Sequence, residues 1–220
     1  MSIETVFVAG AGLMGHGIAQ VLAAAGRRVV LYEPELERAR AGRARIGSNL
    51  DRAVAKGRLT SDVRDAVLER IEPVDAIGRV AEADLVIEAV FEDVAVKQRL
   101  FAELDRLARP ETIFASNTSS ISIARLAEAV ARERRRRFLG MHFFSPVPVM
   151  PLVELIPGPD TEPAVVEAIR ELAGVLDKRV IVAADRPGFI VNRILMPFLA
   201  EAIRAYEAGV GTAEDIDTGA

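Results

Sequence analysis

The strongest constraint on the fold of this chain is a β-branched run that leads directly into a glycine-rich turn. The run TVFVAG, residues 5–10, predicts a strand, and LMGHGIAQVLAAAG, residues 13–26, predicts a helix that ends at a glycine. Gly10, Gly12 and Gly15 have the GxGxxG spacing. The first permits a tight turn, the second lets the backbone approach a pyrophosphate, and the third lets the helix pack closely on the strand. In this context the motif predicts a dinucleotide-binding unit.

The rest of the sequence alternates short apolar runs with longer helical patterns, which predicts a mostly parallel sheet with crossover helices. Further strands are predicted at 28–33, 84–90, 112–117, 138–144, 152–156 and 179–184, and helices at 35–56, from 60 onward, and at 93–108, 121–130 and 162–176. The predicted fold class is therefore α/β, with a Rossmann-type, doubly wound sheet. RPG at 186–188 marks a boundary. We expect a nucleotide-binding domain at 1–185 and the start of an all-helical domain at 186–220.

The cofactor is predicted from the acid at the end of the second strand. Glu33 follows the glycine motif by about 20 residues, the usual place of an acid that binds the ribose. Its carboxylate can accept hydrogen bonds from both ribose hydroxyls and would repel a 2′-phosphate, so NAD is favoured over NADP. The predicted cofactor contacts from this motif are Gly10, Gly12, Leu13, Met14, Gly15 and Glu33.

A second polar group, SNTSS at 116–120, directly follows a predicted central strand. Serine, threonine and asparagine are common where a turn caps the next helix, so a structural role is one interpretation. In an open parallel sheet, however, ligands bind at the carboxyl ends of the strands. The same side chains are therefore expected to face the reactive end of the cofactor.

The stretch MHFFSPVPVMPLVEL, residues 141–155, contains one of the two histidines of the chain. A lone histidine in an apolar run is more often a core residue than a catalyst. Here Pro146 and Pro148 force an extended turn, and LVELI returns as a strand that would bring Glu154 beside His142. A carboxylate in an apolar run is costly unless it is paired. The pattern thus predicts a histidine base oriented by a carboxylate, as alcohol and carbonyl redox chemistry requires.

Charge and composition argue against several other partners and locations. The net charge of −4 gives no broad positive field, so nucleic acid is not expected, and the basic run at 131–138 is interpreted as a solvated connection. No segment has 18 uninterrupted apolar residues, so no membrane span is expected. Glu4 stands where a signal peptide would carry basic residues. The absence of cysteine fits a reducing compartment, and we expect the cytoplasm.

Together these motifs resemble the L-3-hydroxyacyl-CoA dehydrogenase family. The segments that carry the resemblance are GAGLMGHGIAQV, VIEAVFED, FASNTSS, GMHFFSPVPVMPLVEL, RPGFIVNRIL and EDIDTGA, in family order over nearly the whole chain. The resemblance implies a two-domain enzyme that oxidises the 3-hydroxyl of an acyl-CoA with NAD. It also implies a homodimer formed through the helical domain.

The resemblance also implies roles for individual residues. His142 resembles the general acid/base and Glu154 its orienting partner. Ser119 resembles the hydroxyl that contacts substrate and nicotinamide, and Asn192 a polar group that closes the site from the second domain. The other implied contacts are Glu92, Lys97 and Asn117 for the cofactor, and Asn49 and Lys56 for coenzyme A. Ser145 replaces the asparagine of many members near the nicotinamide, as it does in multifunctional β-oxidation subunits.

Two alternatives remain at this stage: a CoA-independent hydroxyacid or sugar-acid dehydrogenase of the same superfamily, and a noncatalytic NAD-binding module.

By the resemblance, the chain stops at Ala220 just as the helical domain begins. The helix predicted from FIVNRILMPFLAEAIRAYEAG carries a wide apolar stripe, a bend at Pro197 and a stop at Gly209. We expect it to lie against the nucleotide domain or a second copy. The chain should then self-associate, bind NAD, and turn over acyl-CoA poorly.

Overall fold

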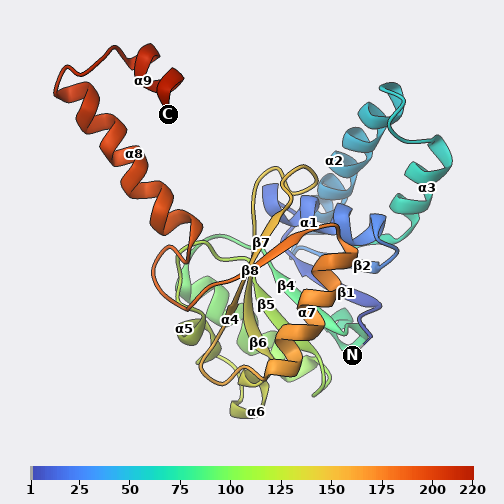
Figure 1. The fold of residues 1–220 in the computed structure, drawn as a ribbon. Coiled ribbons are helices and arrows are strands. Elements are labelled where there is room, and N and C mark those ends of the chain that lie inside the picture. Colours follow the sequence, from blue (N-terminus) through green and yellow to red (C-terminus); the bar gives the residue numbers. More distant parts are fainter. Residues whose placement is uncertain (1) are drawn as a thin grey trace.

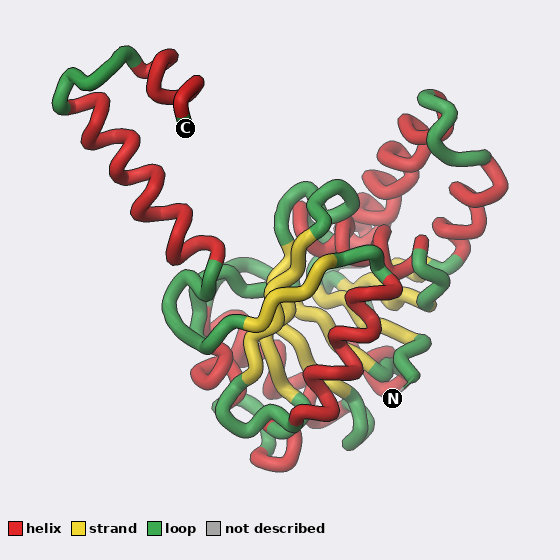
Figure 2. The backbone as a smooth tube through the Cα atoms, in the orientation of Figure 1, coloured by secondary structure: helices red, strands yellow, loops and turns green. Residues whose placement is uncertain are grey.

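The structure is a computed structural model that describes residues 2–220. Within these residues, one eight-stranded sheet has the order β3-β2-β1-β4-β5-β6-β7-β8, with helices on both faces (Figures 1 and 2). The strands are β1 (Thr5–Ala9), β2 (Arg28–Tyr32), β3 (Ile71–Val74), β4 (Leu85–Glu88), β5 (Ile113–Ser116), β6 (Phe138–Phe143), β7 (Leu152–Pro157) and β8 (Arg179–Val182). All neighbouring pairs are parallel except β6 and β7. The predicted doubly wound α/β class is confirmed.

The helices follow the alternation of the sequence. They are α1 (Leu13–Ala24), α2 (Leu36–Ala55), α3 (Ser61–Glu69), α4 (Val94–Leu107), α5 (Ile123–Ala127), α6 (Arg132–Arg135), α7 (Pro163–Val175), α8 (Val191–Glu207) and α9 (Ala213–Gly219), with a 3-10 helix at Ile77–Glu82. Helix α3 begins where the sequence predicted, because the Thr60 side chain accepts a hydrogen bond from the Val63 amide.

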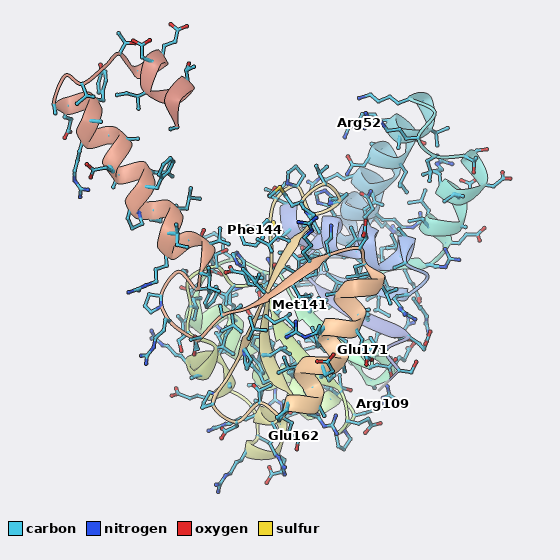
Figure 3. All side chains as sticks on the ribbon, in the orientation of Figure 1. Arg52, Arg109, Met141, Phe144, Glu162 and Glu171 are labelled. Carbon is cyan, nitrogen blue, oxygen red and sulfur yellow. The ribbon has the colours of Figure 1, made fainter. Side chains whose placement is uncertain are left out.

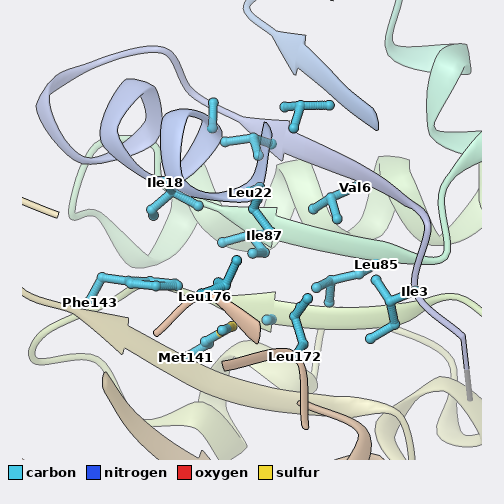
Figure 4. Packing of buried hydrophobic residues seen from close by; sticks show 14 of the residues in the cluster. Ile3, Val6, Ile18, Leu22, Leu85, Ile87, Met141, Phe143, Leu172 and Leu176 are labelled. Carbon is cyan, nitrogen blue, oxygen red and sulfur yellow. The ribbon is translucent and has the colours of Figure 1, made fainter. Parts of the chain in front are cut away.

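Two hydrophobic clusters hold the sheet between its helices. In β1, Val6 belongs to the cluster formed with α1, α2 and α7, and the next residue, Phe7, belongs to the cluster formed with α4 and α5. Successive side chains of a strand point to opposite faces, so a strand covered on both faces must be apolar throughout. Figure 4 shows the first cluster, in which Ile18 and Leu22 of α1 lie over the sheet.

Three local predictions from the sequence differ from the structure. Strand β3 was not predicted, because Pro73 interrupts a run of only four residues; the strand lies at the sheet edge, where proline is tolerated. The helix expected at 121–130 is shorter. The basic run is not simply solvated, because Arg134 is buried and donates to Asp105 and to three backbone carbonyls.

The C-terminal helix α8 extends away from the body of the molecule (Figure 1). None of its residues is buried, and its apolar stripe is open to solvent, with Ile194 67% and Ile203 60% exposed. Of the two expected positions of α8, packing against the nucleotide domain is therefore wrong, and packing against a second copy stays a prediction. The predicted stop is confirmed: α8 ends just before Gly209, which has a φ of 71°.

Candidate active site

The turn between β1 and α1 forms a cradle for an anion. Gly10 has a φ of 102°, and a Cβ on Gly15 would lie 1.8 Å from the Gly10 carbonyl oxygen, so both positions require glycine. A Cβ added to Gly12 would meet nothing within 4 Å. No side chain caps the start of α1, and no acid lies in its first turn. The amide end of α1 therefore remains available to a phosphate group.

Glu33 lies directly after β2 and points to this turn. Its Oε1 accepts a hydrogen bond of 2.6 Å from the Ala11 amide. The carboxylate is therefore fixed beside the glycine motif, where a ribose attached to the phosphates would reach it. Leu13 and Met14 form the first turn of α1, and the Leu13 side chain is 71% exposed.

Strands β6 and β7 bring the histidine and the glutamate of the apolar stretch together. His142 and Glu154 are register partners in this antiparallel pair. His142 Nδ1 lies 2.8 Å from Glu154 Oε2, and both residues are buried. The other carboxylate oxygen, Oε1, accepts hydrogen bonds from the amides of Ile190 and Val191 at 3.0 and 3.1 Å. Glu154 thus fixes both the imidazole and the beginning of α8.

Ser119 extends this arrangement on the other side of the imidazole. Its Oγ lies 3.1 Å from His142 Nε2. A carboxylate only accepts hydrogen bonds, so Nδ1 carries the proton and, in the neutral ring, Nε2 accepts from the Ser119 hydroxyl. The rings of Phe144 and Phe189 pack against the imidazole at centroid distances of 4.5 and 5.7 Å. The result is a buried base with one nitrogen facing an exposed serine.

Figure 3 shows where this arrangement lies in the molecule. Phe144, which follows β6, lies at the upper edge of the sheet, below α2 with Arg52, whereas Arg109 and Glu162 lie at the opposite end. Strands β1, β4, β5 and β6 are parallel, so their carboxyl ends share this upper edge. The glycine turn, SNTSS and His142 are all at or near those ends, where open α/β sheets bind ligands.

Glu92 organises the SNTSS segment. One of its oxygens accepts from the amides of Ser119 and Ser120 at 3.0 and 3.2 Å and from the hydroxyls of Thr118 and Ser120. Burial by itself would raise the pKa of Glu92, but the hydrogen bond from Thr118, the Lys97 charge and the Ser119 amide together hold that pKa below its usual value. Glu92 therefore stays ionised and holds the backbone of Ser119 in place.

Lys97 lies behind Glu92 and is only 1% exposed. Its ammonium contacts Glu88 and Glu92, the latter at 3.2 Å. A direct contact between Lys97 and a cofactor stays a prediction, and its position favours an indirect effect through Glu92. Asn117 is also buried, and its side-chain oxygen accepts from the Phe143 amide at 2.9 Å, which joins the ends of β5 and β6.

Glu88 is a residue of this network that the sequence reasoning missed. It is fully buried at the end of β4 and accepts hydrogen bonds from Ser116, Val90 and Lys97. Burial raises the pKa of this carboxyl, although the Lys97 charge opposes the rise. The signal was present in VIEAV, because a carboxylate in an apolar run needs a partner, the same argument that singled out Glu154.

Two cavities adjoin these residues. An open cleft of about 670 Å³ is lined by Ser119 and Ser120 and, from the region after β8, by Asn192, Met196 and others. A second cavity of about 440 Å³ is lined by α1, by the α2 residues Asn49 and Ala53, by Arg58 and by the loop 145–149. Asn192 and Ser119 thus line the same cleft, and Asn49 and Ser145 line the same cavity.

Lys56 does not line the second cavity, whereas Arg58, which the sequence reasoning did not consider, does. Lys56 is the C-cap residue of α2 and is exposed. Arg58 follows Gly57, whose φ of 67° turns the chain back after the helix.

Within residues 2–220, no helix is long and apolar enough to cross a membrane, and no group of three or more His, Cys, Asp or Glu side chains is arranged to hold a metal ion.

Two protein-family models match this chain. Residues 5–186 match the model of the 3-hydroxyacyl-CoA dehydrogenase NAD binding domain. Residues 188–220 match the model of the 3-hydroxyacyl-CoA dehydrogenase C-terminal domain.

Individual relatives are similar over almost the whole chain. The chain is 47% identical to a 3-hydroxybutyryl-CoA dehydrogenase of Mycobacterium tuberculosis, over 98% of this chain and 76% of that protein. It is 44% identical to the human mitochondrial hydroxyacyl-coenzyme A dehydrogenase, over 98% of this chain and 70% of that protein. The crystal structure of (S)-3-hydroxybutyryl-CoA dehydrogenase from Ralstonia eutropha matches with a TM-score of 0.93 and 41% identity, over 97% of this chain and 75% of that one.

Proposed function

Because the chain belongs to the 3-hydroxyacyl-CoA dehydrogenase family, we propose that His142 and Glu154 are the acid/base pair with which it interconverts (S)-3-hydroxyacyl-CoA and 3-oxoacyl-CoA. The family is one of NAD-dependent oxidoreductases, and this chain carries its NAD-binding domain. The observation that carries the proposal is the chain of contacts from Ser119 through His142 to Glu154, which opens toward a cleft at the carboxyl ends of the strands.

The residues present fit NAD. The uncapped amide end of α1 and the open space at Gly12 suit a pyrophosphate, and the fixed carboxylate of Glu33 suits a ribose with free hydroxyls. We assign Gly10, Gly12, Leu13, Met14, Gly15 and Glu33 to this half of the cofactor, and Glu92, Asn117, Ser119 and Ser145 to the nicotinamide half, with Lys97 behind Glu92. When bound, NAD supplies the acceptor for the hydride that leaves C3 of the substrate.

His142 handles the proton of the reaction. In the oxidising direction Nε2 takes the proton of the 3-hydroxyl as the C3 carbonyl forms, and in the reducing direction the protonated ring returns it to the oxygen. Glu154 keeps the proton of the neutral ring on Nδ1 and stabilises the imidazolium that forms. Phe144 and Phe189 pack against the ring and limit its access to water.

Ser119 and Asn192 position the substrate around this base. Both line the 670 Å³ cleft, and the Ser119 hydroxyl already lies within hydrogen-bond distance of Nε2. We assign the coenzyme A moiety to the side of the 440 Å³ cavity, with Asn49 and Lys56 as predicted contacts. Arg58 joins them, because it lines the cavity and a guanidinium binds phosphate well.

We also propose the domain limits 1–185 and 186–220, a cytoplasmic location and a homodimer. The absence of cysteine supports a reducing compartment. The exposed stripe on α8, which includes Ile194, Leu199 and Ile203, supports self-association through this helix. Sedimentation should show a dimer that weakens in Ile203→Glu. A clean monomer at all concentrations would contradict this assembly.

The function is tested by comparing substrates. With NADH, the protein should reduce acetoacetyl-CoA, measured as the loss of NADH absorbance, and should reduce free acetoacetate much more slowly. Faster turnover of free acetoacetate, or turnover of a sugar acid such as gulonate with NAD, would indicate a CoA-independent dehydrogenase. Binding of NADH without turnover of any of these compounds would indicate a noncatalytic module.

A further inference from the structure

A buried lysine outside the predicted site lies at the end of α7. Asp177 has a φ of 55°, and the amides of Asp177 and Lys178 bond back to the carbonyls of Gly174 and Ala173. This left-handed turn closes the helix and reverses the chain into β8. It also directs the Lys178 side chain inward, where the residue is only 9% exposed.

The Lys178 ammonium binds the loop that follows the catalytic strand. Nζ donates to the carbonyl oxygens of Val147 and Met150, both at 2.8 Å. Within residues 2–220, no carboxylate forms an ion pair with it at 4.0 Å or less. Burial lowers the pKa of Lys178, and only the charge of Asp177 opposes this shift. A buried ammonium costs free energy. The two carbonyls are the groups that offset this cost.

The loop itself has little packing to hold it. The loop borders the 440 Å³ cavity and also a second cavity of about 310 Å³, which Lys178 lines as well. Pro148 and Val149 line both, and Val149 is 73% exposed. Val147, in contrast, is buried and packs closely against α1. A Cβ added to Gly17 of α1 would lie only 3.0 Å from the Cβ of Val147. The contacts that hold the loop therefore include the packing of Val147 and Pro148 near Gly17 of α1 and the two hydrogen bonds from Lys178.

We propose that Lys178 is a positioning residue that holds the loop 145–150 as one wall of the 440 Å³ cavity, and so sets the affinity for the coenzyme A part of the substrate. The inference rests on the proposed function, because it uses the assignment of that cavity to coenzyme A. Lys178 itself does not line the cavity, so it acts through the loop. Loss of its two hydrogen bonds would free the carbonyls of Val147 and Met150 and let the wall move.

Lys178→Met tests this role, with Arg179→Met as the matched control. Both changes remove one positive charge from adjacent positions, but the Arg179 side chain is exposed and, within residues 2–220, forms no hydrogen bond or ion pair. We expect Lys178→Met to weaken binding of acetoacetyl-CoA by about tenfold, equal to ~1.4 kcal/mol. NADH binding should change less than about twofold, and Arg179→Met should change neither. Calorimetric titration of the 220-residue chain gives both affinities.

Hydrogen exchange separates this role from a general loss of stability. In Lys178→Met, exchange should accelerate at the amides of Val149 and Met150, and not in β1 or β4. If Lys178→Met does not fold, Lys178→Gln should show the same selective effects. Unchanged affinity for acetoacetyl-CoA, or faster exchange throughout the sheet with both affinities lowered together, would overturn the inference. If the unsubstituted chain does not bind acetoacetyl-CoA, the proposed function fails instead, and selective exchange in the loop would still show that Lys178 holds the loop 145–150.

Discussion

Replacing Glu154 by glutamine isolates the effect of its charge, because the two side chains have nearly the same shape. In the structure, Oε1 accepts from the amides of Ile190 and Val191, and Oε2 faces His142 Nδ1. The glutamine oxygen will therefore face the two amides, and its NH₂ group must face Nδ1. Because that nitrogen then has to accept, the proton of the neutral ring moves to Nε2. The ring can no longer take the proton of the substrate from that side.

The magnitude follows from the separation of the two groups. The imidazolium and a carboxylate about 4 Å apart attract by roughly 4 kcal/mol at an effective dielectric constant of about 20. Each 1.36 kcal/mol is a factor of ten in rate, so losing this stabilisation lowers kcat about 10³-fold. The neutral ring with its proton on Nε2 also lowers the rate, because that nitrogen cannot then accept the proton of the substrate. We expect a fall of about 10²–10⁴-fold, the range typical of general acid and base catalysis.

The assay is the oxidation of (S)-3-hydroxybutyryl-CoA by NAD, the direction in which the imidazolium forms, with NADH affinity and thermal unfolding measured on the same samples. Glu154→Gln should bind NADH normally and unfold close to the temperature of the unsubstituted chain, because the amide oxygen still satisfies the start of α8. Glu171→Gln on the exposed surface of α7 is the matched control and should leave the rate unchanged. A rate for Glu154→Gln within about threefold of the unsubstituted chain would refute the role of the carboxylate.

Three further predictions concern single side chains. His142→Gln should lower the rate by about 10²–10⁴-fold with NADH affinity nearly unchanged, and a variant that only loses thermal stability would show that His142 is a core residue. NAD should bind at least about tenfold more tightly than NADP, and Glu33→Ala should narrow the difference; equal affinities in the unsubstituted chain would exclude NAD specificity. The lowered pKa of Glu92 means that its stabilising effect is present above the unfolded pKa of about 4.3 and is lost as pH falls toward the folded value. Urea unfolding should thus show Glu92→Gln and the unsubstituted chain converging in stability below about pH 4, and a constant difference would contradict the shift.

The pairing of His142 with Glu154 shows what a local pattern can predict. Two strands joined by a proline-rich turn must be antiparallel neighbours, and an apolar environment penalises each polar side chain unless the two meet. The same argument applied to VIEAV would have found Glu88. The partner of Glu88 was harder to predict, because Lys97 lies nine residues further on, in a helix, and the crossing of α4 over β4 brings its ammonium to the carboxylate.

The sequence by itself determined the order of seven of the eight strands and of the long helices between them, the glycine turn, and the acid after β2. Each of these depends on residues that are close together in the chain: the alternation of side chains along a strand, the need for glycine at the β1–α1 turn, and the length of one strand–helix–strand unit. The tertiary structure alone decided which distant side chains meet. It placed Arg58 in the cavity in place of Lys56, buried Arg134 against Asp105, directed Lys178 to the loop after β6, and left α8 unpacked. Such contacts depend on how whole elements cross and pack, and no window of the sequence contains both partners.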